Sequence, residues 1–67
     1  MFNGKRLKEI RTRMGFTRKQ LASRSGVPFG TLQDMEQGKS LNPHIRAVAA
    51  IADVVSVRME ELLTKPS

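Results

Sequence analysis

The side chains with the clearest binding chemistry lie in one stretch of the chain, residues 17–39, which reads TRKQLASRSGVPFGTLQDMEQGK. Both of its ends are cationic, with Arg18 and Lys19 near the beginning and Lys39 at the end. Guanidinium and ammonium groups bind phosphate oxygens through charge-assisted hydrogen bonds. Between them, Gln33 carries an amide of the kind that hydrogen-bonds to base edges. The stretch therefore suggests recognition of a nucleic acid.

Catalysis and metal binding find little support in the residue types. The chain has no Cys and a single His, His44, which cannot build a His-ligated metal site alone. No Ser, His and Asp set, no carboxylate pair on one expected helix face and no Gly-rich phosphate loop is present. We therefore expect no enzymatic activity, no metal site, no cofactor and no small-molecule substrate.

The length of 67 residues permits one domain, which we place over residues 1–67. No apolar run approaches the roughly 18–20 residues of a membrane span, so we expect no membrane association. The basic start, MFNGKRLKEI, lacks the apolar segment of a signal peptide. Together with the absence of Cys, this favours a cytoplasmic location.

The charge is divided unevenly along the chain, whose net charge is +6. Residues 1–26 hold eight Lys and Arg against one acid, a net charge of +7. Residues 27–67 hold four basic and five acidic residues, a net charge of −1. A polyanion would therefore meet the first part of the chain favourably, although such a face can also be merely solvated.

The apolar spacing predicts five short helices and no strand, so the expected fold class is all-α. The expected helices span about residues 3–14, from Thr17 to Ser25-Gly26, 28–37, from the cap at Asn42-Pro43 to Val55, and 58–64, with 65–67 as a frayed tail. The residues expected to face the core are Leu7, Ile10, Met14, Val27, Leu32, Met35, Ile45, Val48, Ala49, Ala52, Val55, Met59, Leu62 and Leu63.

Local signals mark the ends of these helices. Asn3 can cap the first helix, and Thr17 with Gln20 three residues later forms the pattern of a capping box. Gly26 can adopt the left-handed conformation that reverses the chain after the second helix. Pro28 suits the first position of the third helix, where its missing N–H is not needed.

Two short helices on either side of a Gly turn, over about residues 17–37, indicate a helix-turn-helix. In this motif the second helix, here 28–37, enters the major groove and the first places its N-terminus toward phosphates. We expect base contacts from the exposed side of that helix, through Phe29, Gly30, Gln33 and Asp34. We expect phosphate contacts from Thr17, Arg18, Lys19 and Lys39.

Glu36 lies at the edge of the apolar face of the third helix, beside Leu32 and Met35. A lone buried carboxylate is costly, so Glu36 needs a cation. Arg11, next to Ile10 on the first helix, is the candidate partner. We expect a structural Arg11–Glu36 ion pair that joins the first helix to the third.

Over residues 4–63 the chain resembles the Xre/Cro-type, lambda-repressor-like helix-turn-helix domains. The matching segments are Gly4 to Arg11, Thr17-x-x-Gln20-Leu21-Ala22, Gly26-Val27, Thr31-Leu32, Met35-Glu36-x-Gly38-Lys39, Asn42-Pro43, Ile51-Ala52 and Glu60 to Leu63. The resemblance implies a compact five-helix domain that binds double-stranded operator DNA and regulates transcription, commonly as a repressor. It also supports the Arg11–Glu36 pair.

The resemblance further implies a symmetric homodimer. The expected interface is the fifth helix with the turn before it, where Val55, Val57, Met59 and Leu63 would leave apolar surface. Two copies would supply the specificity that one small domain lacks.

Several residues depart from the family pattern. Arg18 replaces the usual Gln after the cap of the second helix, Ser56 replaces a usual Gly, and Phe29 and Gly30 replace polar base readers. Phe29 is suited to a thymine methyl group, Gly30 permits close approach, and Asp34 can accept from cytosine N4. An exposed aromatic residue beside an acid also fits a protein partner, so a protein–protein interaction module on the same fold is the alternative interpretation.

Overall fold

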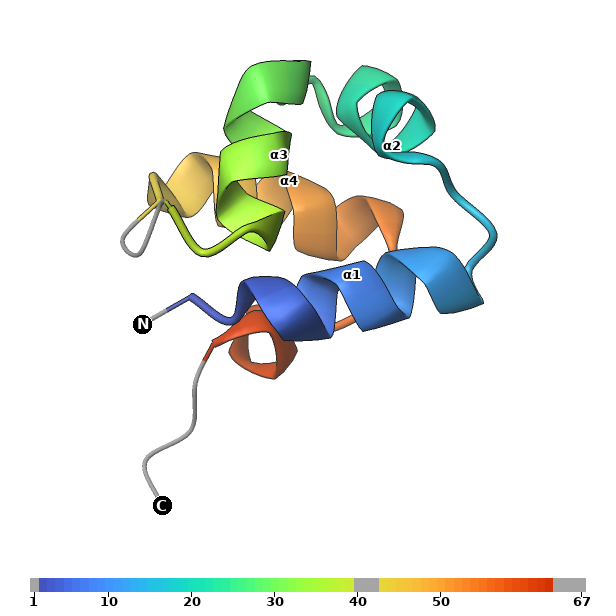
Figure 1. Ribbon diagram of the computed structural model, residues 1–67. Helices are drawn as coiled ribbons and strands as arrows, with labels where there is room; N and C mark the ends of the chain where they lie inside the picture. The colour runs from blue at the N-terminus through green and yellow to red at the C-terminus, as the bar shows by residue number, and fades with distance from the viewer. Residues whose placement is uncertain (1, 40–42, 64–67) are drawn as a thin grey trace.

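The computed structural model describes residues 2–39 and 43–63. Four α-helices and one turn of 3-10 helix follow one another along the chain (Figure 1). They are α1 (Gly4–Arg13), α2 (Arg18–Ser25), α3 (Phe29–Glu36), α4 (Ile45–Val54) and η1 (Met59–Leu62). The all-α prediction is confirmed, and the fifth helix is a four-residue 3-10 turn, shorter than the predicted 58–64.

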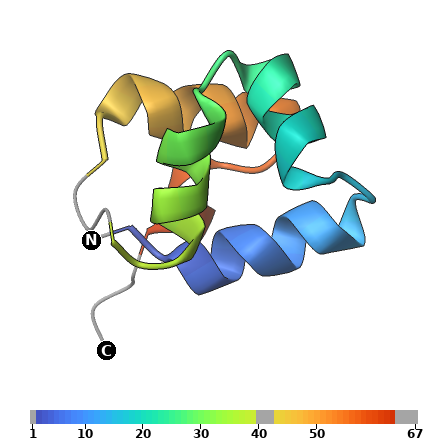
Figure 2. The ribbon, with the colours of Figure 1, turned by 45° about the horizontal axis from the view of Figure 1, so that its top comes forward.

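The helices surround one core in an arrangement in which α2 packs against α3 and α4, and α1 packs against α3 and η1. Figure 2 shows α2 and α3 joined by a short turn, with α1 running below both. Gly26 makes that turn with φ +76°, in the left-handed region that glycine adopts without steric penalty, as predicted. The two helices of the motif are thus held at a fixed angle on a common core.

The predicted caps of the first two helices are present. The Asn3 side chain accepts a hydrogen bond from the Arg6 N–H at 3.0 Å. Thr17 Oγ1 accepts from the Gln20 N–H at 3.1 Å, and Gln20 Oε1 accepts from the Thr17 N–H at 2.9 Å. This capping box fixes where α2 begins because it satisfies two N–H groups that have no partner within the helix.

The starts of α3 and α4 differ from the predictions. Pro28 is the cap residue of α3 and precedes its first helical residue, and it supplies no side-chain hydrogen bond. The predicted cap Asn42 lies outside the described residues, and Pro43 precedes α4 without belonging to it. The residue that caps α4 is His44, whose Nδ1 accepts from the Arg46 N–H at 3.1 Å.

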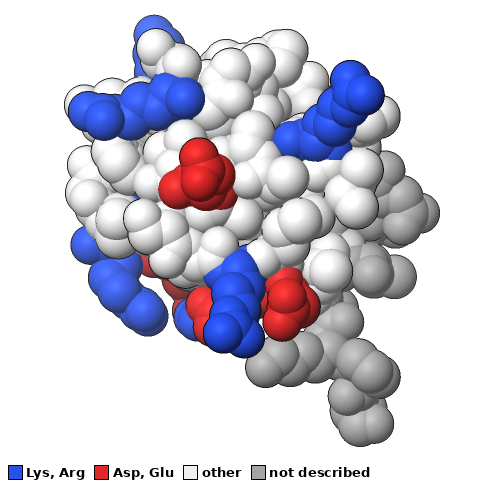
Figure 3. Space-filling view, turned by 180° about the vertical axis from the view of Figure 1, so that it is seen from behind, with Lys and Arg blue, Asp and Glu red and all other residues white. Residues whose placement is uncertain are grey.

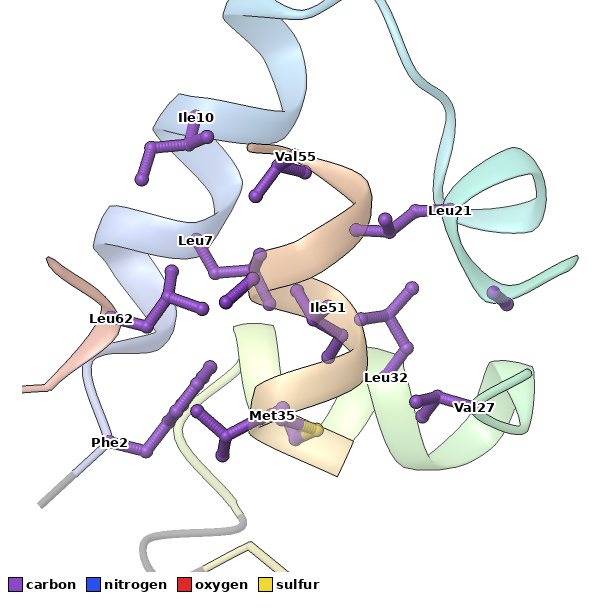
Figure 4. Packing of buried hydrophobic residues seen from close by; sticks show 13 residues of the cluster. Phe2, Leu7, Ile10, Leu21, Val27, Leu32, Met35, Ile51, Val55 and Leu62 are labelled. Atoms are coloured by element: carbon purple, nitrogen blue, oxygen red, sulfur yellow. The ribbon is translucent and has the colours of Figure 1, made fainter. Parts of the chain in front are cut away.

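The core is built from apolar side chains of all five elements (Figure 4). Leu7, Leu21, Leu32, Ile51 and Leu62 are fully buried. Most predicted core positions are confirmed, and the buried set is Phe2, Leu7, Ile10, Leu21, Ala22, Val27, Leu32, Met35, Val48, Ile51, Ala52, Val55 and Leu62.

Four predicted core residues are instead exposed. Met14 is 47% exposed because it follows the last residue of α1, where the chain already turns. Ile45 is 68% exposed at the first position of α4, and Ala49, four residues later, lies on the same outward face. Leu63 is exposed because it follows Leu62 in extended backbone, where successive side chains point to opposite sides.

The beginning and the end of the described chain are joined. Phe2 and Leu63 form an isolated antiparallel bridge, and the Asn3 N–H donates to the Leu62 carbonyl at 2.7 Å. Phe2 is buried in the core, although the sequence analysis did not single it out because it precedes the first helical pattern. A strand-like contact thus closes an otherwise helical domain.

Two backbone features stand out. A Cβ atom on Gly4 would clash with the carbonyl oxygen of Met35, so the start of α1 lies directly against the end of α3. Ser56 adopts φ +59°, which is uncommon for a residue with a side chain. Ser56 thus adopts the left-handed conformation that glycine adopts without steric penalty, at the position where the resembling family usually has Gly.

Candidate nucleic-acid interface

The expected phosphate contacts fall at two places. Thr17, Arg18 and Lys19 lie at the start of α2, where Lys19 is exposed and the Thr17 hydroxyl is engaged in the cap. Lys39 is exposed beyond the end of α3, where its N–H donates to the Asp34 carbonyl at 2.9 Å. The expected phosphate-binding cations thus lie at the start of α2 and beyond the end of α3.

A buried cluster of charges lies behind the start of α2. The Glu36 side chain is only 1% exposed and accepts from Arg11 Nε at 2.7 Å and from Arg11 Nη2 at 3.1 Å. Arg11 Nη1 donates to the Phe16 carbonyl at 2.8 Å, so the guanidinium also fixes the α1–α2 connection. The predicted Arg11–Glu36 pair is confirmed, with the two-point geometry that makes such pairs strong.

Arg18 is a second partner of this carboxylate, which the sequence analysis did not foresee. Its Nε donates to Glu36 Oε1 at 3.2 Å, while its side chain remains 30% exposed. Two features of the sequence could have indicated this contact. A carboxylate can accept several hydrogen bonds, and Arg18 stands where the family usually has Gln. Two guanidinium groups against one carboxylate leave a net positive charge where α2 begins.

The outward side of α3 carries the predicted base-contact residues. Phe29 is 40% exposed, Gly30 and Asp34 are exposed, and Gln33 is partly buried. Leu32, Met35 and Glu36 of the same helix are buried, as the spacing predicted. The four candidate residues thus lie outside the buried part of α3, with the apolar residues Phe29 and Gly30 at the helix start and the acid Asp34 further along.

An open hollow of about 610 Å³ connects the start of α2 with the start of α3. Phe29 contributes to its lining together with Arg18 and Lys19. The whole lining is Arg11, Thr12, Gly15, Phe16, Thr17, Arg18, Lys19 and Phe29. The first residue of α3 and the cations at the start of α2 therefore face a common space, a proximity that sequence spacing does not reveal.

The face of the molecule hidden in Figure 1 differs from this surface. Figure 3 shows that its charged side chains are of both signs, side by side at the bottom of the view and separated by uncharged side chains elsewhere. Within residues 2–39 and 43–63, no helix is long and apolar enough to cross a membrane. The same residues contain no group of three or more His, Cys, Asp or Glu that could hold a metal ion. The arrangement around α2 and α3 is thus the candidate site.

Comparison with known proteins agrees with this geometry. A family model described as helix-turn-helix matches residues 7–62. An uncharacterized HTH-type transcriptional regulator of Archaeoglobus fulgidus is 39% identical over 57 residues, which cover 85% of this chain and 80% of the relative.

Two solved structures extend the comparison. The N-terminal DNA-binding domain of SinR from Bacillus subtilis has a TM-score of 0.88 and 29% identity, over 92% of this chain and 90% of that domain. SinR, the master regulator for biofilm formation, in a crystal structure with DNA has a TM-score of 0.87 and 30% identity, over 91% of this chain and 97% of that one. With a family model over most of its length and the same arrangement of helices, the chain belongs to the helix-turn-helix family of Xre and lambda-repressor-like type.

Proposed function

We propose that this helix-turn-helix protein is a sequence-specific DNA-binding transcriptional regulator that inserts α3 into the major groove of double-stranded DNA. The observation that carries the proposal is the exposed face of α3 next to the cations at the start of α2, with Lys39 exposed beyond the end of α3. An α-helix with its side chains is about 10–12 Å in diameter, and the major groove is about 12 Å wide. Bound at a promoter, such a domain would act as a repressor by covering the site.

The contacts divide into two kinds. Arg18, Lys19 and Lys39, with the Thr17 hydroxyl, which accepts in the cap and can still donate its own proton, would hold phosphates on either side of the groove and so fix the orientation. The side chains or backbone of Phe29, Gly30, Gln33 and Asp34 would meet base edges, and the Asp34 carboxylate would accept from a cytosine N4 amine. The proposal thus assigns affinity to the flanks of α3 and specificity to its face.

Salt dependence tests this division. Binding of a duplex obtained by selection from random sequences should weaken with salt, with a slope of about −0.9 in log–log form for each phosphate contacted. Lys39→Ala should reduce the magnitude of that slope by about one and should weaken all duplexes alike. Failure of the wild-type protein to enrich any duplex at low salt would overturn the proposal.

A homodimer in the cytoplasm is part of the same proposal. Of the four residues expected at the interface, Val55 is fully buried in the core and is therefore excluded. Val57 and Met59 are partly buried and Leu63 is exposed, so an apolar surface around η1 remains for a second copy. Size-exclusion chromatography with light scattering should give a dimer for the wild type and a monomer for Leu63→Glu. If the wild type is monomeric at high concentration, the homodimer part of the proposal is wrong.

A protein-interaction module is the second candidate, and the exposed Phe29 on the same short helix as the exposed acid Asp34 favours it. An aromatic side chain in contact with solvent is a frequent anchor in protein interfaces. Under this alternative, Phe29→Ala would lose a defined protein partner in calorimetry and retain the full DNA affinity of the wild type. If Phe29→Ala instead loses DNA affinity, the result favours a contact between Phe29 and bases over the protein-interaction module.

A further inference from the structure

Phe29 is an aromatic side chain that the fold does not use. It is the first residue of α3, it is 40% exposed, and it stands outside the group of partly buried side chains that pack against the core. Phe16, by contrast, belongs to that group. Aromatic residues stabilise a fold mainly when their rings are buried, and the Phe29 ring is substantially exposed. We therefore expect a partner of Phe29 outside the chain.

Gly30, the next residue, also lacks a reason within the fold. A Cβ atom built there meets nothing within 4 Å, and Gly30 is absent from the positive-φ residues. A glycine inside a helix costs about 0.5–1 kcal/mol relative to alanine. The bare backbone at Gly30, which follows Phe29 in the exposed part of α3, therefore leaves an open space, here called the notch, that does not serve the stability of the domain.

The major groove offers one apolar feature that such a pair can recognise. Its base edges present hydrogen-bond donors and acceptors, except for the C5-methyl group of thymine. Neither Phe29 nor Gly30 has a side chain that donates or accepts a hydrogen bond. The hollow that Phe29 lines is also lined by Arg18 and Lys19, so a phosphate held by those cations would bring a base of the same strand to the ring.

We propose that Phe29 and the notch at Gly30 read the C5-methyl group of a thymine in each half-site, so that part of the sequence preference of this domain rests on a methyl contact. This inference rests on the proposed function and specifies the chemistry of its reading face. It predicts that the loss of one thymine methyl group weakens binding only when the Phe29 side chain is present.

The test replaces thymine by deoxyuridine, which removes the methyl group and leaves base pairing unchanged. A duplex selected from random sequences with the wild-type protein is prepared with each thymine replaced in turn, and fluorescence anisotropy measures each Kd. At one thymine per half-site the wild type should bind the uracil duplex about fourfold more weakly, as expected for one buried methyl-sized group. In Phe29→Ala the thymine-to-uracil ratio at that position should fall to about one.

Two further variants separate a methyl contact from a general loss of binding. Lys39→Ala should weaken binding of the thymine duplex and of the uracil duplex equally, because Lys39 contacts a phosphate. The thymine-to-uracil ratio of Kd values should therefore stay that of the wild type. Phe29→Leu, which retains an apolar side chain, should keep part of the ratio. A duplex that is bound but insensitive to uracil everywhere overturns the inference and leaves the proposed function intact. A ratio that persists in Phe29→Ala also overturns it, and failure to select any duplex overturns both.

Discussion

The two ends of α3 differ in what holds them, although the helix is only eight residues long. At its C-terminal end, Met35 and Glu36 are buried, the backbone of Gly4 lies against their carbonyl groups, and two arginines bind the Glu36 carboxylate. At its N-terminal end, Pro28 gives no side-chain cap, and Phe29 and Gly30 face outward. One end is fixed by the fold and the other is available to a ligand, so substitutions at the two ends should affect different properties.

The largest effect should come from Glu36→Gln. Loss of the carboxylate charge leaves two guanidinium groups without their partner, and removal of one member of a buried pair costs about 3–5 kcal/mol. Urea unfolding followed by far-ultraviolet circular dichroism measures it, since the chain has no Trp or Tyr for fluorescence. Glu9→Gln is the control, because its pair with Arg6 is 3.9 Å long and half exposed, and it should change stability by less than about 0.5 kcal/mol. If Glu36→Gln and Glu9→Gln lowered the free energy of unfolding equally, the structural role assigned to Glu36 would be wrong.

Gly4→Ala should come next. The added Cβ meets the Met35 carbonyl oxygen, and because that atom belongs to the backbone, α1 must move away from α3. Forced repacking of this kind costs about 1–3 kcal/mol. The free energy of unfolding from urea titration provides the measurement. An unchanged free energy would mean that the start of α1 and the end of α3 are not in close contact.

Arg18→Met should have a smaller and mixed effect, because Arg18 belongs to both regions. The variant keeps most of the aliphatic contact but loses one hydrogen bond of a partly exposed guanidinium, a cost of about 1 kcal/mol or less. It should also reduce the salt slope of DNA binding by about one. Stability loss with an unchanged slope would confine Arg18 to a structural role.

The smallest effect on stability, with the opposite sign, is expected for Gly30→Ala. Open space around the new Cβ and the better helix propensity of alanine should stabilise the domain by about 0.5–1 kcal/mol. Affinity for the selected duplex should nevertheless fall, because the methyl group fills the notch beside Phe29. A variant that is both more stable and equally tight in binding would show that the notch has no part in reading.

The features that could be predicted from the sequence are mainly those that depend on residues close together in the chain. The caps of α1 and α2 and the turn at Gly26 depend on residues a few positions apart, so the patterns identified them. The Arg11–Glu36 pair was predictable because both residues border apolar stripes that must meet. The role of Arg18 in the same cluster and the burial of Phe2 depend on how distant elements approach, which local spacing does not encode.

The candidate site was predictable to a similar degree. Helical spacing alone separated the outward residues of α3 from the buried ones. It did not place Phe29 in one hollow with the cations of α2, because that proximity depends on the angle at the Gly26 turn. The individual base and phosphate contacts stay predictions until they are measured with DNA.

The bridge between Phe2 and Leu63 has a consequence for synthesis of the chain. Leu62 is fully buried against residues from the beginning of the sequence, and Asn3 donates to its carbonyl. Domains fold as units while the chain emerges from the ribosome N-terminus first. This domain cannot complete its core until residue 62 has emerged, so a ribosome stalled before that point should display a loosely packed, protease-sensitive set of helices.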